Sequence, residues 1–158
     1  TVFDSPFTAE VEREYIRNFP QRGVWKVAVS EESGRTVGFQ VLEPIGSYTA
    51  AFDHVGTLGT YVSLELRRQG IAKALFASTF ASARRKGYEK LFTFVRADNP
   101  AALATYLAHG FEVIGTARRH AKIDGSYIDE ILIEKSLGLG TSGHELRHNS
   151  GLSTTPLN

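Results

Sequence analysis

Residues 58 to 73, with the sequence LGTYVSLELRRQGIAK, constrain the fold of this chain more than any other stretch. An apolar strand pattern at Leu58, Tyr61 and Val62 leads through a short charged turn to Gly70, where a long helical pattern begins. A helix N-terminus presents unpaired backbone N–H groups and the positive end of the helix dipole, which together stabilise an anion. Gly70 has no Cβ and so allows a ligand close to the main chain. The segment therefore predicts a strand, a turn and a helix arranged to bind a phosphate.

The turn within this segment fits the spacing Gln/Arg-x-x-Gly-x-Gly/Ala through Arg67, Gly70 and Ala72. Arg67 and Arg68 supply two fixed positive charges before the helix, and the small side chain of Ala72 keeps the first helical turn open. An ordinary strand-to-helix turn with surface arginines would fit the same residues. That alternative does not account for a second cluster of residues further along the chain.

The second cluster, formed by Asn99, Tyr106 and Gly110-Phe111, fits the pattern Asn-x(6)-Tyr-x(3)-Gly-Phe. Together with Tyr61-Val62 ahead of the turn, the two patterns resemble those of the GNAT acetyltransferases over roughly residues 8 to 137. The resemblance implies an α/β fold, in which helices flank a mixed, mostly antiparallel sheet. One strand–helix–strand connection in that sheet is expected to be a right-handed parallel crossover.

The resemblance also implies that acetyl-CoA binds as a co-substrate, without a metal. Its pyrophosphate is expected over the N–H groups of residues 67 to 72, and its pantetheine arm along the strand near Val62. A backbone N–H near Val62 would hydrogen-bond the thioester oxygen and stabilise the charge that develops there in the transition state. The cofactor-binding residues implied are Tyr61, Val62, Arg67, Arg68, Gln69, Gly70, Ile71, Ala72, Asn99 and Tyr106.

Tyr106 matches the family position whose phenol assists the departing CoA thiolate, so it is the predicted catalytic residue. Because a free tyrosine has a pKa of about 10 and a thiol one of about 8.5, a hydrogen bond to the thiolate is better supported than full proton transfer. The alternative interpretation of Tyr106 is a core residue on an amphipathic helix. Asn99 is equally compatible with a simple helix N-cap.

The acceptor side of the reaction is less defined by the sequence. The resemblance implies an N-acetyltransferase in which a primary amine, on a small molecule or a protein, attacks acetyl-CoA directly in a ternary complex. Many family members carry a Glu on the strand before the turn, but residues 55 to 60, VGTLGT, contain no carboxylate. Five residues remain open as the base that takes the amine proton: Glu43, His54, Glu65, Asp129 and Glu130.

Two non-enzymatic functions are alternatives to an acetyltransferase. A non-catalytic CoA-binding or sensor module would keep the turn but lack a base, and a protein-interaction domain would bind no CoA at all. The absence of Cys from the 158 residues is compatible with direct attack, since it excludes a Cys nucleophile.

Composition narrows the other function classes. The net charge is only +1, so no broad nucleic-acid surface is expected. No apolar run approaches the length of about 20 residues that spans a bilayer, and no signal-peptide pattern opens the sequence. These features favour a cytoplasmic protein that does not contact membranes. They are compatible with a homodimer.

Hydrophobic periodicity predicts the order of the elements. Helical patterns cover residues 8–19, 71–86 and 100–109, and strand patterns cover 24–30, 36–42, 55–62, 91–95, 111–116 and 127–134. Two glycines in 55–62 suggest a bulge there or a ligand close to the backbone. A charged stretch with its turn at Asp124-Gly125 is expected to join the last two strands.

The domain expected from these patterns covers residues 1–137 and lacks a counterpart of the family's first strand and helix. Residues 138–158 are rich in Gly, Ser and Thr and are predicted to form a mobile tail. The tail contains His144 and His148 in a match to a zinc-protease pattern. That chemistry needs a stable helix and a third ligand, so the histidines are interpreted as an exposed pair that binds metal only adventitiously.

Overall fold

The computed structural model describes residues 8–46, 48–66 and 69–138. Its helices are α1 (Ala9–Arg17), α2 (Ile71–Arg85) and α3 (Pro100–Ala108), with short 3-10 turns η1 (Ala50–Phe52) and η2 (Leu64–Leu66). The strands are β1 (Val24–Val29), β2 (Thr36–Pro44), β3 (Val55–Val62), β4 (Lys90–Arg96), β5 (Glu112–Ile123) and β6 (Ser126–Ser136). Apart from residue 138, the predicted tail, including the His144 and His148 match, lies outside the described residues.

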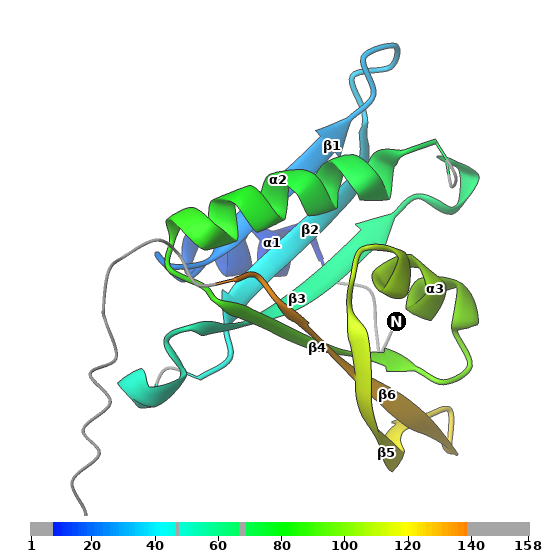
Figure 1. The fold of residues 1–158 in the computed structure, drawn as a ribbon. Helices are drawn as coiled ribbons and strands as arrows, with labels where there is room; N and C mark the ends of the chain where they lie inside the picture. The colour runs from blue at the N-terminus through cyan, green and yellow to red at the C-terminus, as the bar shows by residue number, and fades with distance from the viewer. Residues whose placement is uncertain (1–7, 47, 67–68, 139–158) are drawn as a thin grey trace, which may run out of the picture.

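The six strands form one sheet in the order β1-β2-β3-β4-β6-β5 (Figure 1). Every neighbouring pair is antiparallel except β3 and β4, which run parallel and are connected through α2. Antiparallel β1 and β2 form a hairpin, whereas the longer connection needed by parallel strands contains a helix. The predicted mixed sheet with a single parallel crossover is confirmed for the described residues.

The largest difference from the sequence prediction is the length of β5. The prediction ended that strand at residue 116 because Arg118, Arg119 and His120 suggested a loop, but the strand continues to Ile123. Its pairing with β6 shifts register between Ala117 and Ala121, and Arg119 has a φ of 52°. These polar residues therefore lie in a bulged edge strand, where charges and bulges are common.

The bulge suggested for β3 is not observed in its pairing with β2, which runs without a shift from Gly38 opposite Val62 to Pro44 opposite Gly56. Close packing of neighbouring side chains explains why position 56 is a glycine. A Cβ on Gly56 would lie 3.2 Å from side-chain atoms of both Leu42 and Tyr88. The glycine thus allows two large buried side chains to pack against the strand.

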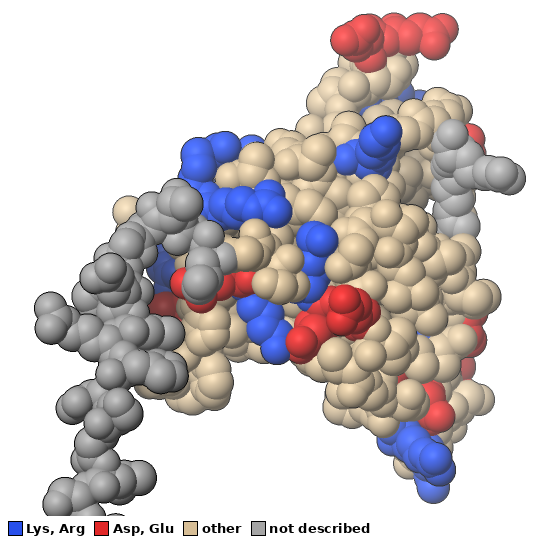
Figure 2. Space-filling model, in the orientation of Figure 1, with Lys and Arg blue, Asp and Glu red and all other residues tan. Residues whose placement is uncertain are grey.

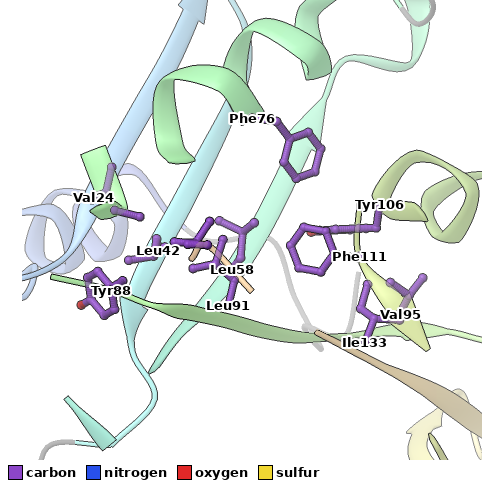
Figure 3. Packing of buried hydrophobic residues seen from close by; sticks show 12 residues of the cluster. Val24, Leu42, Leu58, Phe76, Tyr88, Leu91, Val95, Tyr106, Phe111 and Ile133 are labelled. Atoms are coloured by element: carbon purple, nitrogen blue, oxygen red, sulfur yellow. The ribbon is translucent and has the colours of Figure 1, made fainter. Parts of the chain in front are cut away.

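The hydrophobic core lies between the sheet and the helices α2 and α3. At its centre, Phe76 of α2 is fully buried and its ring contacts the rings of Tyr106, His109 and Phe111 (Figure 3). Leu42, Leu58 and Leu91 from three adjacent strands continue the same cluster. This core joins α2, α3 and the middle of the sheet.

The opposite face of the sheet is covered over β1 and β2 by α1. A row of aromatic rings crosses this face from α1 to β3, with centroid separations of 4.6–5.9 Å. Its members are Tyr15, Phe19, Trp25, Phe39 and Tyr61. The helix is therefore attached to the sheet by edge and stacked aromatic contacts.

Charged side chains are unevenly distributed over the face shown in Figure 2. The tip of the β1–β2 hairpin carries Glu31 and Glu32, and the last turn of α2 carries Arg84 and Arg85. None of the helices in the described ranges is long and apolar enough to cross a membrane.

Phe76→Ala should lower the free energy of unfolding by about 3–5 kcal/mol, because it leaves a cavity among three aromatic rings. Urea denaturation followed by circular dichroism measures this loss. Phe52→Ala is a matched control, since Phe52 is 41% exposed, and it should cost less than about 1 kcal/mol. Similar losses for both variants would contradict the placement of the core around Phe76.

Candidate functional site

Strands β3 and β4 are paired over only three residues each. Val55, Gly56 and Thr57 lie opposite Lys90, Leu91 and Phe92, and no further pairs between the two strands occur in the described residues. Beyond this point β3 continues to Val62 and β4 to Arg96, and Figure 1 shows them running apart. The sheet therefore contains a wedge-shaped gap, with α3 near its open end.

The backbone of β3 directs hydrogen-bonding groups into this gap. The Ile45 N–H donates to the Val55 carbonyl at 3.2 Å and the Ser63 N–H donates to the Val37 carbonyl at 2.9 Å, so odd-numbered β3 residues bond to β2. Successive residues of a strand alternate between its two neighbours. The N–H groups of Thr60 and Val62 therefore face the gap, beyond the last residue of β3 that pairs with β4.

The Tyr106 hydroxyl lies at the same position on the gap. It donates to Thr60 Oγ1 at 2.9 Å, and Gln40 Nε2 donates to the same oxygen at 2.8 Å. Tyr106 is 7% exposed and its ring packs edge-on against Phe76. The interpretation of Tyr106 as a core residue and its prediction as a catalytic residue are therefore compatible, because its ring belongs to the core and its hydroxyl points to β3.

Burial raises the pKa of Tyr106 to about 12, although the hydrogen bond to Thr60 lowers it and the nearby Tyr61 raises it slightly. The phenol thus stays protonated at neutral pH and can donate a hydrogen bond. Sequence reasoning did not identify Thr60 or Gln40 as partners of this hydroxyl. A signal for Gln40 was available, because it is a polar residue inside the apolar run VGFQVL and is fully buried.

The start of α2 has the properties of an anion site that the sequence predicted. Gly70 adopts the left-handed conformation with a φ of 80° and contributes no side-chain cap to the helix. An ideal Cβ on Gly70 would have no heavy atom within 4 Å, so the backbone here is open. Gln69 is exposed, while Ile71 and Ala72 are half-buried.

Four other residues were predicted to bind the cofactor, and the structure describes two of them, Asn99 and Tyr61. Arg67 and Arg68 lie outside the described residues. Asn99 caps α3, because its side-chain oxygen accepts a hydrogen bond from the Ala102 N–H at 3.2 Å. Tyr61 is 40% exposed and stacks on Phe39, so its side chain lies on the face of the sheet opposite Tyr106.

Three of the five candidate bases lie away from the gap or are engaged elsewhere. His54 precedes β3 at the closed end of the gap, where its carbonyl accepts from the Glu89 and Lys90 N–H groups. Glu65 is exposed in η2, beyond the end of β3. Asp129 Oδ1 accepts the Arg119 N–H at 2.7 Å and stabilises the β5 bulge.

Comparison with known proteins identifies the family. The sequence model of the Acetyltransferase (GNAT) family matches residues 2–111. The chain belongs to the GNAT acetyltransferase family. Acetyl-CoA is therefore the acetyl donor.

Among the relatives of this GNAT chain is the phosphinothricin N-acetyltransferase of Streptomyces coelicolor, which is 28% identical over 138 residues, covering 85% of this chain and 80% of the relative. N-acetyltransferase family 8 member 3 of Mus musculus is 30% identical over 87 residues, or 55% of this chain and 38% of that protein.

Two solved structures are similar in fold. A phosphinothricin acetyltransferase from Sinorhizobium meliloti in complex with acetyl-CoA superposes with a TM-score of 0.80 at 21% identity, covering 91% of this chain and 77% of that one. A ribosomal-protein-alanine N-acetyltransferase from Brucella melitensis gives 0.76 at 26% identity, covering 86% and 83%.

The raised pKa of Tyr106 predicts a loss of stability at high pH. Above pH 10 an unfolded tyrosine loses its proton while buried Tyr106 keeps it up to about pH 12, so the folded state binds more protons and stability falls as pH rises. From pH 9 to 11 the wild type should lose about 1 kcal/mol more than Tyr106→Phe. Urea denaturation of both proteins at the two pH values measures the difference, and equal losses would contradict the burial of this phenol.

Proposed function

We propose that the protein is an N-acetyltransferase that transfers the acetyl group of acetyl-CoA to a primary amine by direct attack within a ternary complex. The observation that carries this proposal is the Tyr106 hydroxyl, held 2.9 Å from Thr60 Oγ1 beside strand N–H groups that face the gap. A donor for the thioester oxygen and a donor for the leaving sulfur thus lie together. The names of the relatives, which specify N-acetylation, support an amine acceptor.

Acetyl-CoA binding is assigned to the residues predicted for it, with the pyrophosphate at the start of α2. The open backbone at Gly70, where a Cβ would meet no neighbouring atom, fits an anion placed over the first N–H groups of the helix. Arg67 and Arg68 would add positive charge there. The pantetheine arm is assigned to the open edge of β3, where Thr60 and Val62 offer N–H groups for extended pairing.

The position of Tyr106 refines the expected oxyanion donor. The sequence placed that donor near Val62, but the phenol lies at Thr60, two residues earlier. We therefore assign the thioester oxygen to the Thr60 N–H and the CoA sulfur to the Tyr106 hydroxyl. The Thr60 N–H acts on charge that develops on the oxygen as the amine attacks, and the Tyr106 hydroxyl acts on charge that develops on the sulfur as the C–S bond breaks. Both donors therefore stabilise a transition state more than the ground state.

The missing carboxylate within residues 55–60 favours one alternative, a CoA-binding sensor without turnover. The two functions are separated by measuring free thiol released from acetyl-CoA with a panel of primary amines that includes phosphinothricin and L-alaninamide. Amine-dependent thiol release supports the enzyme. Tight CoA binding without release on the whole panel would support the sensor.

Gly70→Ala should weaken acetyl-CoA binding at least about tenfold, because the methyl group occupies the space where phosphate approaches and the φ of 80° strains an L-residue. Isothermal titration calorimetry measures the affinity. Gly34→Ala is a matched control, since Gly34 has a φ of 65° with open space around it but lies in the β1–β2 turn. The control should lose similar stability and keep wild-type affinity; equal affinities in both variants would place the phosphate elsewhere.

Tyr106→Phe should lower kcat by about 10²- to 10⁴-fold, the usual contribution of a positioned acid. The change keeps the ring in the core but removes the hydroxyl that donates to Thr60 and, in the proposal, to the leaving thiolate. Acetyl-CoA affinity should change little, because the lost interaction forms mainly in the transition state. Single-turnover acetyl transfer measures the effect, and a variant with full rate would remove Tyr106 from the mechanism.

A further inference from the structure

We propose that Glu43 of β2 is the carboxylate that binds the ammonium group of the acceptor and takes its proton, with Tyr15 as the residue that positions it. This inference rests on the proposed function, because it assumes that an amine is acetylated.

The register of β2 and β3 places Glu43 on the side of the sheet from which the acceptor must arrive. The Phe39 and Tyr61 rings stack on one face, whereas Gln40 and Thr60 are hydrogen-bonded on the other. Because side chains alternate along a strand, Glu43 shares the face of Phe39 and Tyr61. The other face is filled by α2, α3 and the Tyr106 ring, so we assign the approach of the acceptor to the Glu43 side.

Glu43 lies beside the narrow end of the gap on this open face. Its cross-strand partner is Thr57, the last residue of β3 that is paired with β4. Directly opposite residues of an antiparallel pair have Cβ atoms about 4.5–5.5 Å apart. Glu43 is therefore one strand away from the point where β3 leaves β4.

The Glu43 carboxylate is held in place by α1. The Tyr15 hydroxyl donates to Glu43 Oε2 at 2.9 Å, and burial together with this bond raises the pKa of Tyr15 well above its usual value. The bond engages one carboxylate oxygen and leaves the other for an ammonium group. No Lys or Arg pairs with Glu43 within the described residues, so its negative charge is available to a cationic substrate.

The neighbours of Glu43 suit an amine with an apolar substituent. Tyr15 contacts it from α1 through the hydrogen bond to Oε2. Tyr61 lies on the same face of β3 and its ring leans over Gly59, because a Cβ on Gly59 would lie 3.4 Å from Tyr61 Cε2. Aromatic rings near a carboxylate stabilise an ammonium group through cation–π attraction and accept an apolar group beside it.

Glu130, the remaining candidate, is less suited to this role. It lies opposite Arg96 on β6, on the far side of β4 from β3. The residue is 2% exposed and its Oε2 has no hydrogen-bond partner among the described residues. A substrate in solvent does not reach a carboxylate that is covered in this way, whereas half-buried Glu43 is accessible.

The proposed step balances as follows. The ammonium group gives one proton to Glu43, which passes it to water, and the free amine attacks the thioester carbon. A C–N bond forms and the C–S bond breaks. The nitrogen gives its second proton to water through Glu43 as the amide forms, and the thiolate, stabilised by a hydrogen bond from the Tyr106 hydroxyl, takes one proton from water. The products are the amide, the CoA thiol and one proton released to water.

Glu43→Gln tests the assignment, because it keeps the size and the acceptor for Tyr15 but removes the charge. With phosphinothricin and L-alaninamide as probes, kcat/KM at pH 7 should fall about 10²- to 10⁴-fold, while acetyl-CoA affinity stays unchanged. The defect should shrink as pH rises towards the pKa of the amine, since a neutral amine no longer needs a base. A defect of the same size at every pH would indicate a structural role and overturn the proposal.

A second variant keeps the test informative if Glu43→Gln is damaged in other ways. Thr57→Glu, added to Glu43→Gln, returns a carboxylate to the same face at the cross-strand position and should restore at least about tenfold of the lost kcat/KM. Tyr15→Phe should lower kcat/KM by about three- to tenfold and give a pH profile intermediate between the other two. Glu32→Gln, in the β1–β2 turn, is the control and should match the wild type.

The outcomes for this residue and for the proposed function are separable. Full activity of Glu43→Gln beside an active wild type, or no gain from Thr57→Glu, would overturn the role of Glu43 alone. A wild type that binds acetyl-CoA but acetylates no amine would overturn the proposed function and the role of Glu43 with it.

Discussion

The short parallel pairing between β3 and β4 is the constraint on which the rest of the structure depends. Only three residues of each strand are paired, from Val55 to Thr57 and from Lys90 to Phe92. Backbone N–H groups beyond that point need a partner, and a cofactor that enters the gap can supply one. The molecule tolerates the open strands because the core around Phe76 and the hydrogen bond from Tyr106 to Thr60 connect the two halves of the sheet below and beside the gap.

The two faces of the sheet carry different groups, and the proposed function assigns one substrate to each face. On one face lie the start of α2 and the Tyr106 hydroxyl, which the proposal assigns to acetyl-CoA. On the other face lie the aromatic row from Tyr15 to Tyr61 and the carboxylate of Glu43, which the proposal assigns to the acceptor. Strand alternation produces this division, because Thr60 and Tyr61 are neighbours in sequence but point to opposite sides.

Family membership identifies the acetyl donor of this protein, whereas the base has to be inferred from individual residues. The match over residues 2–111 assigns the family and its acetyl donor. It does not assign a base, since residues 55–60 of β3 contain no carboxylate. The register with β2 offers a physical solution, because Glu43 lies directly across from Thr57 and reaches the same face. A carboxylate on a neighbouring strand can thus serve a position that the strand at the gap leaves empty.

The sequence by itself determined the order of the elements, the single parallel crossover and the turn at Gly70, because these follow from local periodicity and from the conformational freedom of glycine. It also placed Tyr106 on a short helix after Asn99. It did not separate a core tyrosine from a catalytic one, and it extended β5 too little at Arg118 and Arg119, whose charges suggest a loop unless the edge strand is seen. The contact of Tyr106 with Thr60, 46 residues apart, and that of Tyr15 with Glu43, 28 residues apart, were decided only by the tertiary structure. Such contacts depend on strand register and helix packing, which no local pattern encodes.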